Sequence, residues 1–527
     1  MFYNTTGFIN YYSDEGIIHV KGLIIYKDNA SGKDSALSLL LDVFNEKVSW
    51  NELFGFFCVV IELSDRTVYF TDNSGMMPLY YSVSNNNCSI SSSMITLKKE
   101  CHIDKTDLNI TSVLQFLEYG FVFGNQTFFY SILRCKGDYY YEFNKSCGIK
   151  DNIKQITINN SKSKSIFKKK MEKILEAIKK EQKQTGKKLL CDCSGGADSR
   201  LIISLAQEVG LDFDLFVRGV PTCADIKVAR KIASLLGKKL FELTPVDVKN
   251  FSNDNLLRIW RNSDGNYDLF EVDQFIDQYQ FKQKKQVLYI LGGLAGGEYY
   301  RNYRLLRRGK GKEFYYSELD NILRLRIQGV IPHIYEEYRI ETDGLLKKIE
   351  QKSKNSTNIY YYLNYIFPGS SGILYNIASN YCCNYGPLGE SMLAKQFAAP
   401  VHFYKKILNR WFRSIISKQN IQLAKEKTIY GMTLYNSFFS YFHDFMHSSF
   451  VLVKRVWSKI VFHKMYKPSS FTVSAVTNLD SFINTSEYMN MVEEIHKLNI
   501  FQSRECILNV SKNYIGRFMV IYYWLIN

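Results

Sequence analysis

The chain contains little proline, fewer acidic than basic residues and no long apolar run. Only 8 of its 527 residues are proline, while apolar residues make up 46% and charged residues 22%. These fractions exclude a disordered or collagen-like chain and supply enough apolar side chains for a sizeable core. At typical domain sizes of ~100–200 residues, the length predicts roughly two to four domains.

No stretch approaches the ~20 consecutive apolar residues of a membrane-spanning helix. The apolar run from Phe518 to Ile526 is too short for that and predicts a buried terminal helix. The first residues, from Met1 to Thr5, have neither a basic start nor an apolar run, so we expect no secretory signal. The sequence therefore predicts a cytoplasmic protein without a membrane span.

The 11 cysteines form no paired CxxC motifs of the kind that predicts a zinc site. Their number is odd and they are scattered along the chain. Cys191 and Cys193 lie in a predicted strand, and Cys382 and Cys383 are adjacent. Free thiols of a cytosolic protein fit this pattern better than a disulfide framework or a metal cluster.

Lys and Arg number 67 against 51 Asp and Glu, which gives a formal charge of +16. Such an excess suits a nucleic acid or an anionic membrane surface as partner, or simply a Lys-rich solvated surface. One basic segment, from Lys162 to Lys188, has apolar residues at helical spacing, namely Phe167, Met171, Ile174, Leu175 and Ile178. The pattern predicts an amphipathic helix with a solvated basic face, in preference to an RNA or lipid site.

The first 155 residues are rich in short strand patterns separated by turns. Predicted strands cover residues 54–61, 67–70, 88–91 and 137–143, and a helix is expected near residues 112–118. Hairpin spacing of such strands indicates antiparallel sheet. The polar stretch 159–165 is predicted to be a linker.

After the linker the pattern changes to strands alternating with helices, which indicates a parallel sheet. Predicted strands cover residues 189–193, 212–220, 239–243 and 287–291. Helices are expected from residue 198 and over residues 225–236. From about residue 313 onward the chain is predicted to be mostly helical.

The most informative stretch is Ser194-Gly195-Gly196-Ala197-Asp198-Ser199, between a predicted strand and a predicted helix. Glycines let the backbone fold tightly around an anion, and a helix N-terminus offers unpaired N–H groups. Asp198 supplies a hard oxygen ligand of the kind that Mg²⁺ needs. The string therefore favours a phosphate-binding loop over an ordinary capped glycine turn.

This string resembles the SGGxDS loop of the PP-loop ATP pyrophosphatases, which cleave ATP between the α and β phosphates and adenylate an acceptor. Most of the chain resembles the asparagine synthetase family, which includes β-lactam synthetases and lasso-peptide macrolactam synthetases. The resemblance implies an α+β N-terminal-nucleophile-hydrolase-like sandwich over residues 1–158. It implies an α/β PP-loop (HUP-like) parallel-sheet domain with a helical C-terminal part over residues 166–527.

The first half resembles the family's glutaminase domain. Residues 71–81 resemble the motif RDxxGxxPLYY, with Thr71 in place of the Arg. Glutamine hydrolysis in the family needs a cysteine directly after the initiator Met, because its thiolate is the nucleophile. Here Phe2 stands at that position, and Cys58 is the first cysteine. Residues 21–26 also replace the glutamine-binding stretch NGEIYN, so we expect no glutamine hydrolysis.

The second half keeps part of the synthetase motifs. Phe216 and Val217 end the second predicted strand, where relatives hold adenine through main-chain groups. Residues 291–298 resemble the family motif LSGEGxDE, and Gly293 and Glu298 match it.

Other positions of that motif depart from the family, and Ala295 stands at its second glycine. Leu294 replaces a glutamate that acts near the substrate, and Gly297 replaces a second Mg²⁺ aspartate. The resemblance then leaves Asp198 to bind the metal alone, with Glu298 in partial compensation.

Residues 425–432 resemble the family's lysine-containing loop, and the resemblance makes Lys427 the residue that stabilises charge on the adenylate and pyrophosphate, with Lys425 as the second choice. Residues 385–390 resemble the segment RxPFLD, with a packing role equally open. Arg200 either clamps a phosphate or is solvated.

His443 and His447 are four residues apart, but Asp444 stands where a zinc protease needs glutamate. Ordinary surface or packed histidines are therefore favoured.

Together these residues predict an ATP- and Mg²⁺-dependent ligase that adenylates a carboxylate and joins it to an amine without hydrolysing glutamine. Both substrates are small molecules or peptides, no DNA partner is expected, and a homodimer is left open. Two alternatives remain: a PP-loop enzyme that modifies tRNA, and a nucleotide-binding relative that has lost catalysis.

Overall fold

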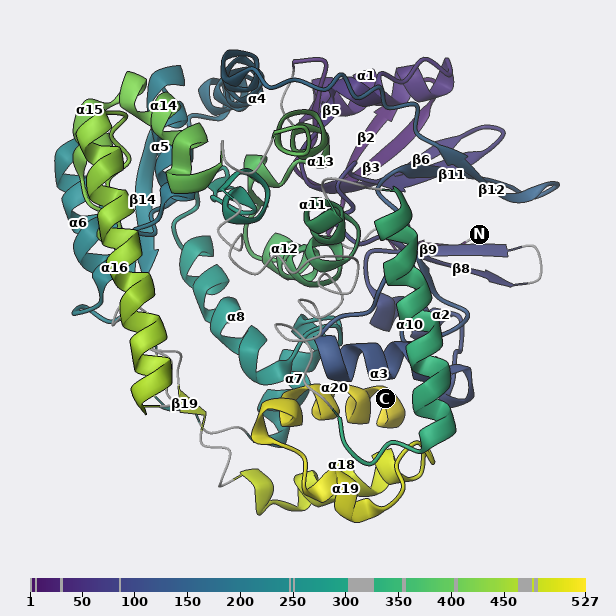
Figure 1. Cartoon of the computed structure of the whole chain (residues 1–527). Coiled ribbons are helices and arrows are strands. Elements are labelled where there is room, and N and C mark those ends of the chain that lie inside the picture. The colour runs from purple at the N-terminus through teal and green to yellow at the C-terminus, as the bar shows by residue number, and fades with distance from the viewer. Residues whose placement is uncertain are drawn as a thin grey trace.

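The computed structural model describes residues 2–4, 7–28, 32–84, 87–245, 248–249, 252–301, 327–352, 357–401, 406–462, 476–477 and 482–527. Figure 1 shows strands of the first half gathered on one side, with a second sheet and its helices on the other. The predicted helical region lies partly outside these residues, because 313–326 are not described.

The N-terminal region contains two main sheets. The larger has the strand order β12-β11-β7-β6-β3-β2, and every neighbouring pair is antiparallel. Its strands are β2 (Ile9–Ser13), β3 (Gly16–Gly22), β6 (Phe57–Leu63), β7 (Thr67–Thr71), β11 (Tyr139–Asn144) and β12 (Gly148–Ile153). The predicted antiparallel region is confirmed.

The smaller sheet has the order β1-β9-β8-β10, with β1 parallel to β9 and the other pairs antiparallel. Its strands are β1 (Phe2–Asn4), β8 (Tyr80–Ser84), β9 (Asn87–Ser91) and β10 (Leu133–Arg134). A short ladder joins β4 (Ile25–Tyr26) to β5 (Leu53–Phe54). The helices of this region are α1 (Lys33–Phe44), α2 (Met94–Glu100) and α3 (Ile110–Tyr119).

The predicted strand over residues 54–61 is divided in two by Gly55. This glycine has a φ of +105°, and a Cβ at this position would lie 2.0 Å from the carbonyl oxygen of Leu23. The chain therefore turns between β5 and β6 although its apolar pattern is nearly continuous. Strands β2 and β3 and helix α1 were not predicted.

The second region is built on a five-stranded parallel sheet with the order β15-β14-β13-β17-β18. Its strands are β13 (Leu189–Asp192), β14 (Phe213–Arg218), β15 (Leu240–Leu243), β17 (Ile290–Leu291) and β18 (Asn384–Tyr385). The predicted parallel sheet is confirmed, and β18 completes it from a distant part of the chain.

Alternate residues of the central strands face opposite sides of this sheet, as a strand requires. Leu189 and Cys191 join the large core that includes α4 (Lys164–Thr185) and α5 (Ala197–Val209). Leu190 and Ile290 belong to a smaller cluster with Phe281 of α8 (Leu269–Gln283) packed against it. Both faces are therefore covered, which explains why these strands are apolar throughout.

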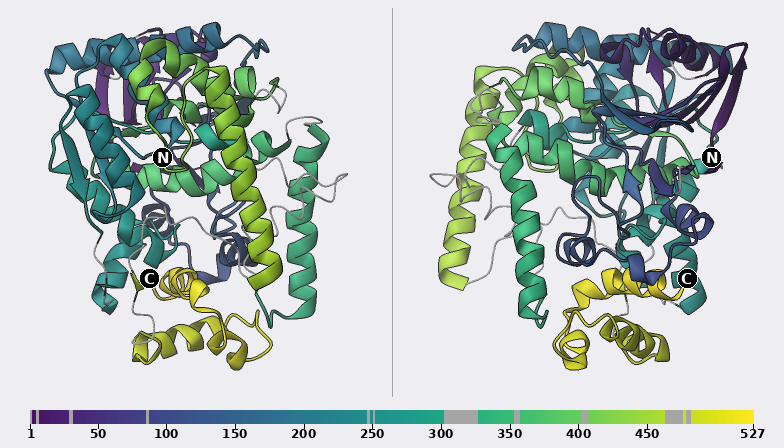
Figure 2. Two further views of the ribbon diagram at one scale, coloured as in Figure 1. Left: turned by 60° about the vertical axis from the view of Figure 1, so that its left-hand side comes forward. Right: turned by 90° about the vertical axis from the view of Figure 1, so that its right-hand side faces the viewer.

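The described residues from 327 onward are mostly helical (Figure 2). Together with the preceding helices they comprise α6 (Ala224–Leu236), α7 (Asn253–Asn262), α10 (Pro332–Lys352), α11 (Thr357–Tyr361), α12 (Gly372–Ser379), α13 (Ser391–Leu393), α14 (Arg410–Gln419), α15 (Ile421–Lys425), α16 (Phe438–Phe462), α18 (Ser486–His496), α19 (Arg504–Leu508) and α20 (Ile515–Ile526). The closing apolar run is the buried helix α20, as expected.

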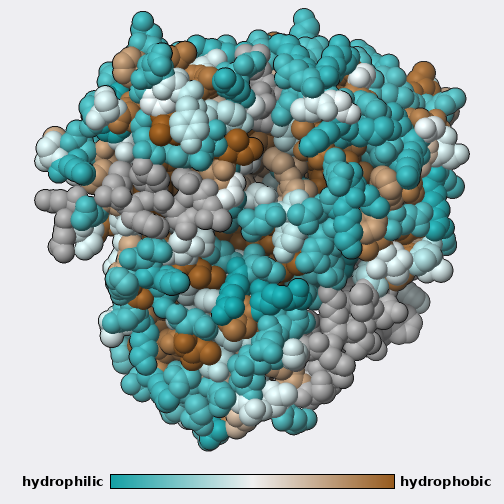
Figure 3. Space-filling model, turned by 180° about the vertical axis from the view of Figure 1, so that it is seen from behind, coloured by the Kyte–Doolittle hydropathy of each residue, from teal (hydrophilic) through white to brown (hydrophobic). Residues whose placement is uncertain are grey.

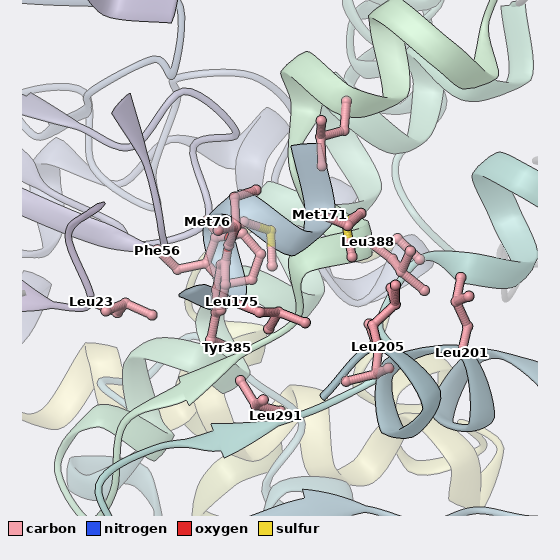
Figure 4. Packing of buried hydrophobic residues seen from close by; sticks show 14 of the residues in the cluster. Leu23, Phe56, Met76, Met171, Leu175, Leu201, Leu205, Leu291, Tyr385 and Leu388 are labelled. Carbon is pink, nitrogen blue, oxygen red and sulfur yellow. The ribbon is translucent and has the colours of Figure 1, made fainter. Parts of the chain in front are cut away.

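One buried core crosses from the first region to the second. Leu23, Phe56 and Met76 of the N-terminal region share a cluster with Leu291 and Tyr385 of the parallel sheet (Figure 4). The phenyl ring of Phe56 meets the Tyr385 ring edge-on at 5.2 Å. The proposed boundary between residues 158 and 166 falls after β12 and at the start of α4, but no separate cores mark it.

The surface agrees with the Lys-rich composition. The apolar positions of α4 are buried, as its spacing predicts. Figure 3 shows a largely hydrophilic face with separate hydrophobic patches. All 11 cysteines are free, and six are buried. Among the described residues, no helix combines the length and apolar character that crossing a bilayer requires.

Candidate functional site

The order of the parallel strands places a topological switch point, the position at which such sheets form a crevice, beside β13. The chain runs from β13 outward to β14 and β15, then returns to the other side of β13 for β17 and β18. Loops after β13 and β17 therefore leave the sheet in different directions, and ligands of open α/β sheets bind at such a point. The loop 194–199 follows β13, and the glycine-rich turn 292–298 follows β17.

The predicted phosphate loop lies in the expected strand–loop–helix setting. Gly196 directly precedes α5, and no side chain caps this helix N-terminus. The Ser199 hydroxyl donates to the Ser194 carbonyl oxygen at 2.8 Å, and the two hydroxyl oxygens are 3.1 Å apart. An uncapped helix start with two neighbouring hydroxyls can receive the oxygens of a phosphate group.

Gly195 is enclosed by two segments that sequence reasoning did not connect to it. Its N–H donates to Asp225 Oδ1 at 2.8 Å, and its carbonyl oxygen accepts from the Ile429 N–H at 3.2 Å. A Cβ on Gly195 would lie 2.2 Å from the side chain of Ile429. The position therefore requires glycine, and Asp225 holds an N–H that a bound phosphate would otherwise take.

Asp198 is paired with an arginine that the sequence did not reveal as a partner. Arg301 Nη2 lies 2.6 Å from Asp198 Oδ2, while Asp198 Oδ1 is buried with no hydrogen-bond partner among the described residues. Burial raises the pKa of Asp198 to about 6; the Arg301 guanidinium opposes this rise, and the Glu298 carboxylate adds to it.

Two carboxylates of the type that holds a hard cation lie here, Asp198 and Glu298. Asp198 Oδ1 is an orphaned carboxylate oxygen, and Glu298 is near enough for its charge to act on Asp198. Oxygen ligands of this kind suit Mg²⁺, which fills its remaining positions with water or phosphate oxygens. Among the residues that the structure describes, no cluster of three or more His, Cys, Asp or Glu is placed to hold a metal.

The turn after β17 packs directly against the start of α5. A Cβ on Gly293 would lie 2.7 Å from the Ser199 nitrogen, and one on Gly296 would lie 2.3 Å from Asp198 Oδ1. Both positions therefore depend on glycine. Ala295, between them, has a φ of +68°.

Leu294 faces the turn at residues 386–389. A Cβ on Gly386 would lie 2.7 Å from Leu294 Cβ, and one on Gly389 would lie 3.3 Å from Leu294 Cδ2. The position that corresponds to a glutamate in the resembled family is thus occupied by a packed apolar side chain.

The main chain of Phe216 is hydrogen-bonded within the parallel sheet. Its carbonyl oxygen accepts from the Cys193 N–H at 2.7 Å, and Val217 pairs in register with Glu242 of β15. The adenine contact of these two residues stays a prediction. Lys282 Nζ lies 4.5 Å from the centre of the Phe216 ring, so it forms a cation–π contact that the sequence did not suggest.

Lys282 also reaches the end of β13. Its ammonium group lies 2.7 Å from Asp192 Oδ1, and its side chain is fully buried. The pair stands two residues before Ser194, at the carboxyl edge of the sheet, and adds a buried cation to one wall of the crevice.

Arg200 neither faces the phosphate loop nor is solvated, so both predicted roles are wrong. Its side chain is fully buried and donates to the carbonyl oxygens of Glu426 at 2.5 Å and Lys427 at 2.7 Å. These bonds tie α5 to the segment that covers Gly195. The Lys427 side chain on that segment is exposed, whereas Lys425 Nζ lies 5.2 Å from the Tyr435 ring.

The segment resembling RxPFLD joins the two regions. The Tyr385 hydroxyl donates to Glu390 Oε1 at 2.9 Å, and the same oxygen accepts from the Gly55 N–H at 2.7 Å. Burial raises the pKa of Glu390 to about 8. These contacts support the packing role.

The two histidines also have ordinary partners. His443 Nδ1 lies 2.9 Å from Asp444 Oδ1, and His447 Nε2 lies 2.9 Å from the Tyr430 carbonyl oxygen.

Most of residues 21–26 in the N-terminal region are buried. Leu23, Ile24 and Tyr26 are fully buried, and Lys21 is buried with its ammonium group donating to Asn376 Oδ1 at 2.9 Å. Burial raises the pKa of the Cys58 thiol to about 12, which makes it a poor nucleophile.

No protein-family model matches the sequence, and no curated protein matches it. Solved structures show partial similarity to the chain. NMN synthetase from Francisella tularensis is 16% identical, with 27% of this chain and 58% of that chain covered and a TM-score of 0.18. Glutamine phosphoribosylpyrophosphate amidotransferase from B. subtilis, complexed with ADP and GMP, is 12% identical, with 46% and 49% covered and a TM-score of 0.19.

An allosteric regulatory enzyme of purine biosynthesis is 13% identical, with 46% and 48% covered and a TM-score of 0.19. The chain thus spans about half the length of the solved structures it matches. Superpositions of this quality assign neither fold nor function, so the residues of the crevice must carry the functional argument.

Proposed function

We propose that the chain is an ATP-dependent ligase of the asparagine-synthetase type. It adenylates a carboxylate, releases AMP and pyrophosphate, and forms an amide bond without hydrolysing glutamine. The observation that carries the proposal is the uncapped start of α5 behind Ser194-Gly195-Gly196, at the point where the parallel sheet reverses its strand order.

Different residues of the crevice bind the phosphates and the metal. The N–H groups at the start of α5, with Ser194 and Ser199, bind the pyrophosphate portion of ATP. Asp198 Oδ1 and Glu298 hold Mg²⁺, which when bound neutralises phosphate charge.

A substrate carboxylate attacks the α phosphate, and the leaving pyrophosphate is stabilised by these donors and by Lys427. Phe216, Val217 and Gly293 line the nucleotide site. Asp225 must release the Gly195 N–H when phosphate enters.

The amine comes from the second substrate or from free ammonia. Cys58, the first cysteine of the N-terminal region, is buried with a raised pKa, which does not favour it as a nucleophile. Residues 23–26 fill the place of a glutamine-binding stretch with packed apolar side chains. This region therefore supports the synthetase half structurally.

ATP–pyrophosphate exchange over a panel of amino-acid and peptide carboxylates tests the proposal. We expect exchange with at least one carboxylate, and we expect Asp198→Asn to reduce it more than a hundredfold. Asp212→Asn, at the opposite end of the sheet on the surface, is the matched control and should keep full exchange. Failure of the chain to bind ATP with Mg²⁺ in equilibrium dialysis would reject the proposal.

One observation favours a non-catalytic nucleotide-binding relative instead. Arg301 already supplies a cation to Asp198, and Leu294 packs where a substrate-binding glutamate stands in relatives. In that case ATP binds equally well in EDTA and in Mg²⁺, because no metal is needed. The ligase proposal expects binding at least tenfold weaker in EDTA. The described residues provide no specific support for tRNA modification.

A further inference from the structure

A small polar pocket lies between the N-terminal region and two later segments, residues 363–368 and 391–395, and none of its lining residues belongs to the phosphate loop. Its volume is about 70 Å³. A water-sized sphere needs about 10–15 Å³ of such volume, so the pocket holds roughly five to seven water-sized atoms. It is too small for a nucleotide and shares no lining residue with Ser194–Ser199.

The charged lining of this pocket is mainly cationic. The pocket is lined by three cationic residues, Arg134, Lys136 and Lys395, and by one acidic residue, Asp138. Arg134 belongs to β10 of the N-terminal region, whereas Lys395 follows α13 in the helical part. Cations from two distant parts of the chain therefore meet at one small cavity.

Arg134 carries a buried charge that forms no direct ion pair among the described residues, although the charge of the Asp72 carboxylate acts on it. Only 7% of the residue is exposed, and Nη2 donates to the Gly75 carbonyl oxygen at 2.8 Å. No carboxylate among the described residues forms an ion pair with it, and burial lowers the pKa of its guanidinium. A buried charge left in this state costs free energy, which an anion in the pocket would offset.

Lys395 has a similar environment. It makes no hydrogen bond or ion pair with the described residues. Burial lowers the pKa of its ammonium group, and the more distant charge of Asp138 only partly opposes this. Its ammonium group is thus a second donor that has no acceptor among the described residues.

Neutral groups fix the pocket wall between these cations. The Ser391 N–H donates to Ser74 Oγ at 2.9 Å, and the Ser391 hydroxyl donates to the Asn73 carbonyl oxygen at 2.7 Å. Behind the wall, the buried Lys154 ammonium donates to the Gly137 carbonyl oxygen at 2.8 Å and to Asn73 Oδ1 at 3.2 Å. The wall is therefore rigid before any ligand arrives.

We propose that this pocket binds a small oxyanion, of the size of inorganic phosphate, sulfate or a short carboxylate, between Arg134 and Lys395. Such an anion has about four or five heavy atoms, which matches the volume. Its oxygens accept from the guanidinium and ammonium groups and supply a directly bonded counterion. The site is independent of the ATP proposal, and its ligand links the N-terminal and helical regions.

Titration of the full chain with inorganic phosphate, sulfate and acetate at constant ionic strength tests this site. We expect at least one of these anions to bind with a single stoichiometry by calorimetry and to raise the unfolding temperature progressively with concentration. Lys395→Gln should weaken binding at least tenfold, because it removes a charged donor. Lys170→Gln is the matched control, since Lys170 bonds Gln396 outside the pocket.

A second variant separates this pocket from the phosphate loop. Ser199→Ala alters the loop and should leave binding of the small anion unchanged, whereas Lys395→Arg should largely restore what Lys395→Gln loses. The proposal fails if none of the three anions binds, or if Ser199→Ala rather than Lys395→Gln abolishes binding.

Discussion

Ala295 adopts a backbone conformation that an L-residue with a side chain disfavours. Its φ is +68°, and only 2% of the residue is exposed, so it cannot relax toward solvent. The left-handed conformation costs roughly 1–2 kcal/mol for a residue other than glycine. The strain lies in the turn that packs against Asp198, where relatives of the resembled family carry glycine.

Ala295→Gly should therefore stabilise the fold by about 1 kcal/mol, because glycine adopts positive φ without cost. Urea denaturation followed by circular dichroism measures the change. Ala177→Gly is the matched control: Ala177 is buried within α4, and glycine there should destabilise by about 1 kcal/mol. Equal effects of the two substitutions would contradict the argument.

Glu390 should make the fold less stable as the pH rises. Its pKa is about 8 in the folded chain against an ordinary value of 4.5, so the folded state binds the proton more tightly than the unfolded state. The stabilisation is complete below pH 4.5 and is lost progressively up to pH 8. Within that window this group contributes a slope of about −1.4 kcal/mol per pH unit.

Glu390→Gln should remove that slope while its amide oxygen still accepts from the Gly55 N–H and the Tyr385 hydroxyl. The measurement is the unfolding free energy from pH 5 to 8.5 for both proteins. Glu341→Gln, on the exposed face of α10, should leave the slope unchanged. Parallel pH profiles of Glu390→Gln and the original chain would refute the assignment.

At the scale of elements, Arg200 couples α5 to the segment after α15. Its guanidinium donates to the carbonyl oxygens of residues 423, 426 and 427. No other described side chain donates to these three oxygens. Without it the buried Leu423 carbonyl oxygen and the partly buried oxygens of residues 426 and 427 lose this donor, at about 1–3 kcal/mol for a fully buried group and less for a partly buried one.

Arg200→Met should destabilise the fold by about 3 kcal/mol and free the segment that carries Lys425 and Lys427. Limited trypsin digestion should then cut after these exposed lysines at least fivefold faster. Arg258→Met, which removes an exposed arginine bonded only to the Asn255 side chain, is the control. Unchanged cleavage in Arg200→Met would show that the segment is held by other contacts.

Local sequence patterns predicted the positions of strands and helices better than the partners of the site residues. Strand–turn–helix spacing located β13, α5 and β14 to within two residues, because period and glycine turns are local properties. The partners of the site are distant in sequence: Asp225 is 30 residues from Gly195, Lys282 is 90 from Asp192, and Arg301 is 103 from Asp198. No local rule selects one Arg or Lys among 67 as the partner.

At the scale of the whole molecule, buried polar contacts reinforce the shared core. Asp264, after α7, accepts from the Ser93 hydroxyl at 2.6 Å and from the Met94 N–H at 2.7 Å, at the start of α2. Glu390 accepts from Gly55, and Lys21 donates to Asn376. Each contact joins the N-terminal region to the region that follows residue 166, and all except the partly buried Ser93 bond are buried.

Because apolar and polar contacts both cross the proposed boundary, the two regions should unfold in one cooperative transition. Far-ultraviolet circular dichroism and tyrosine fluorescence should give coincident urea curves. A fragment of residues 1–158 should remain unfolded, since it loses the partners of Phe56, Met76 and Gly55. Asp264→Ala should lower the midpoint of the whole transition, because it leaves the start of α2 without its acceptor. Two separate transitions, or a folded fragment, would instead establish 1–158 as an autonomous domain.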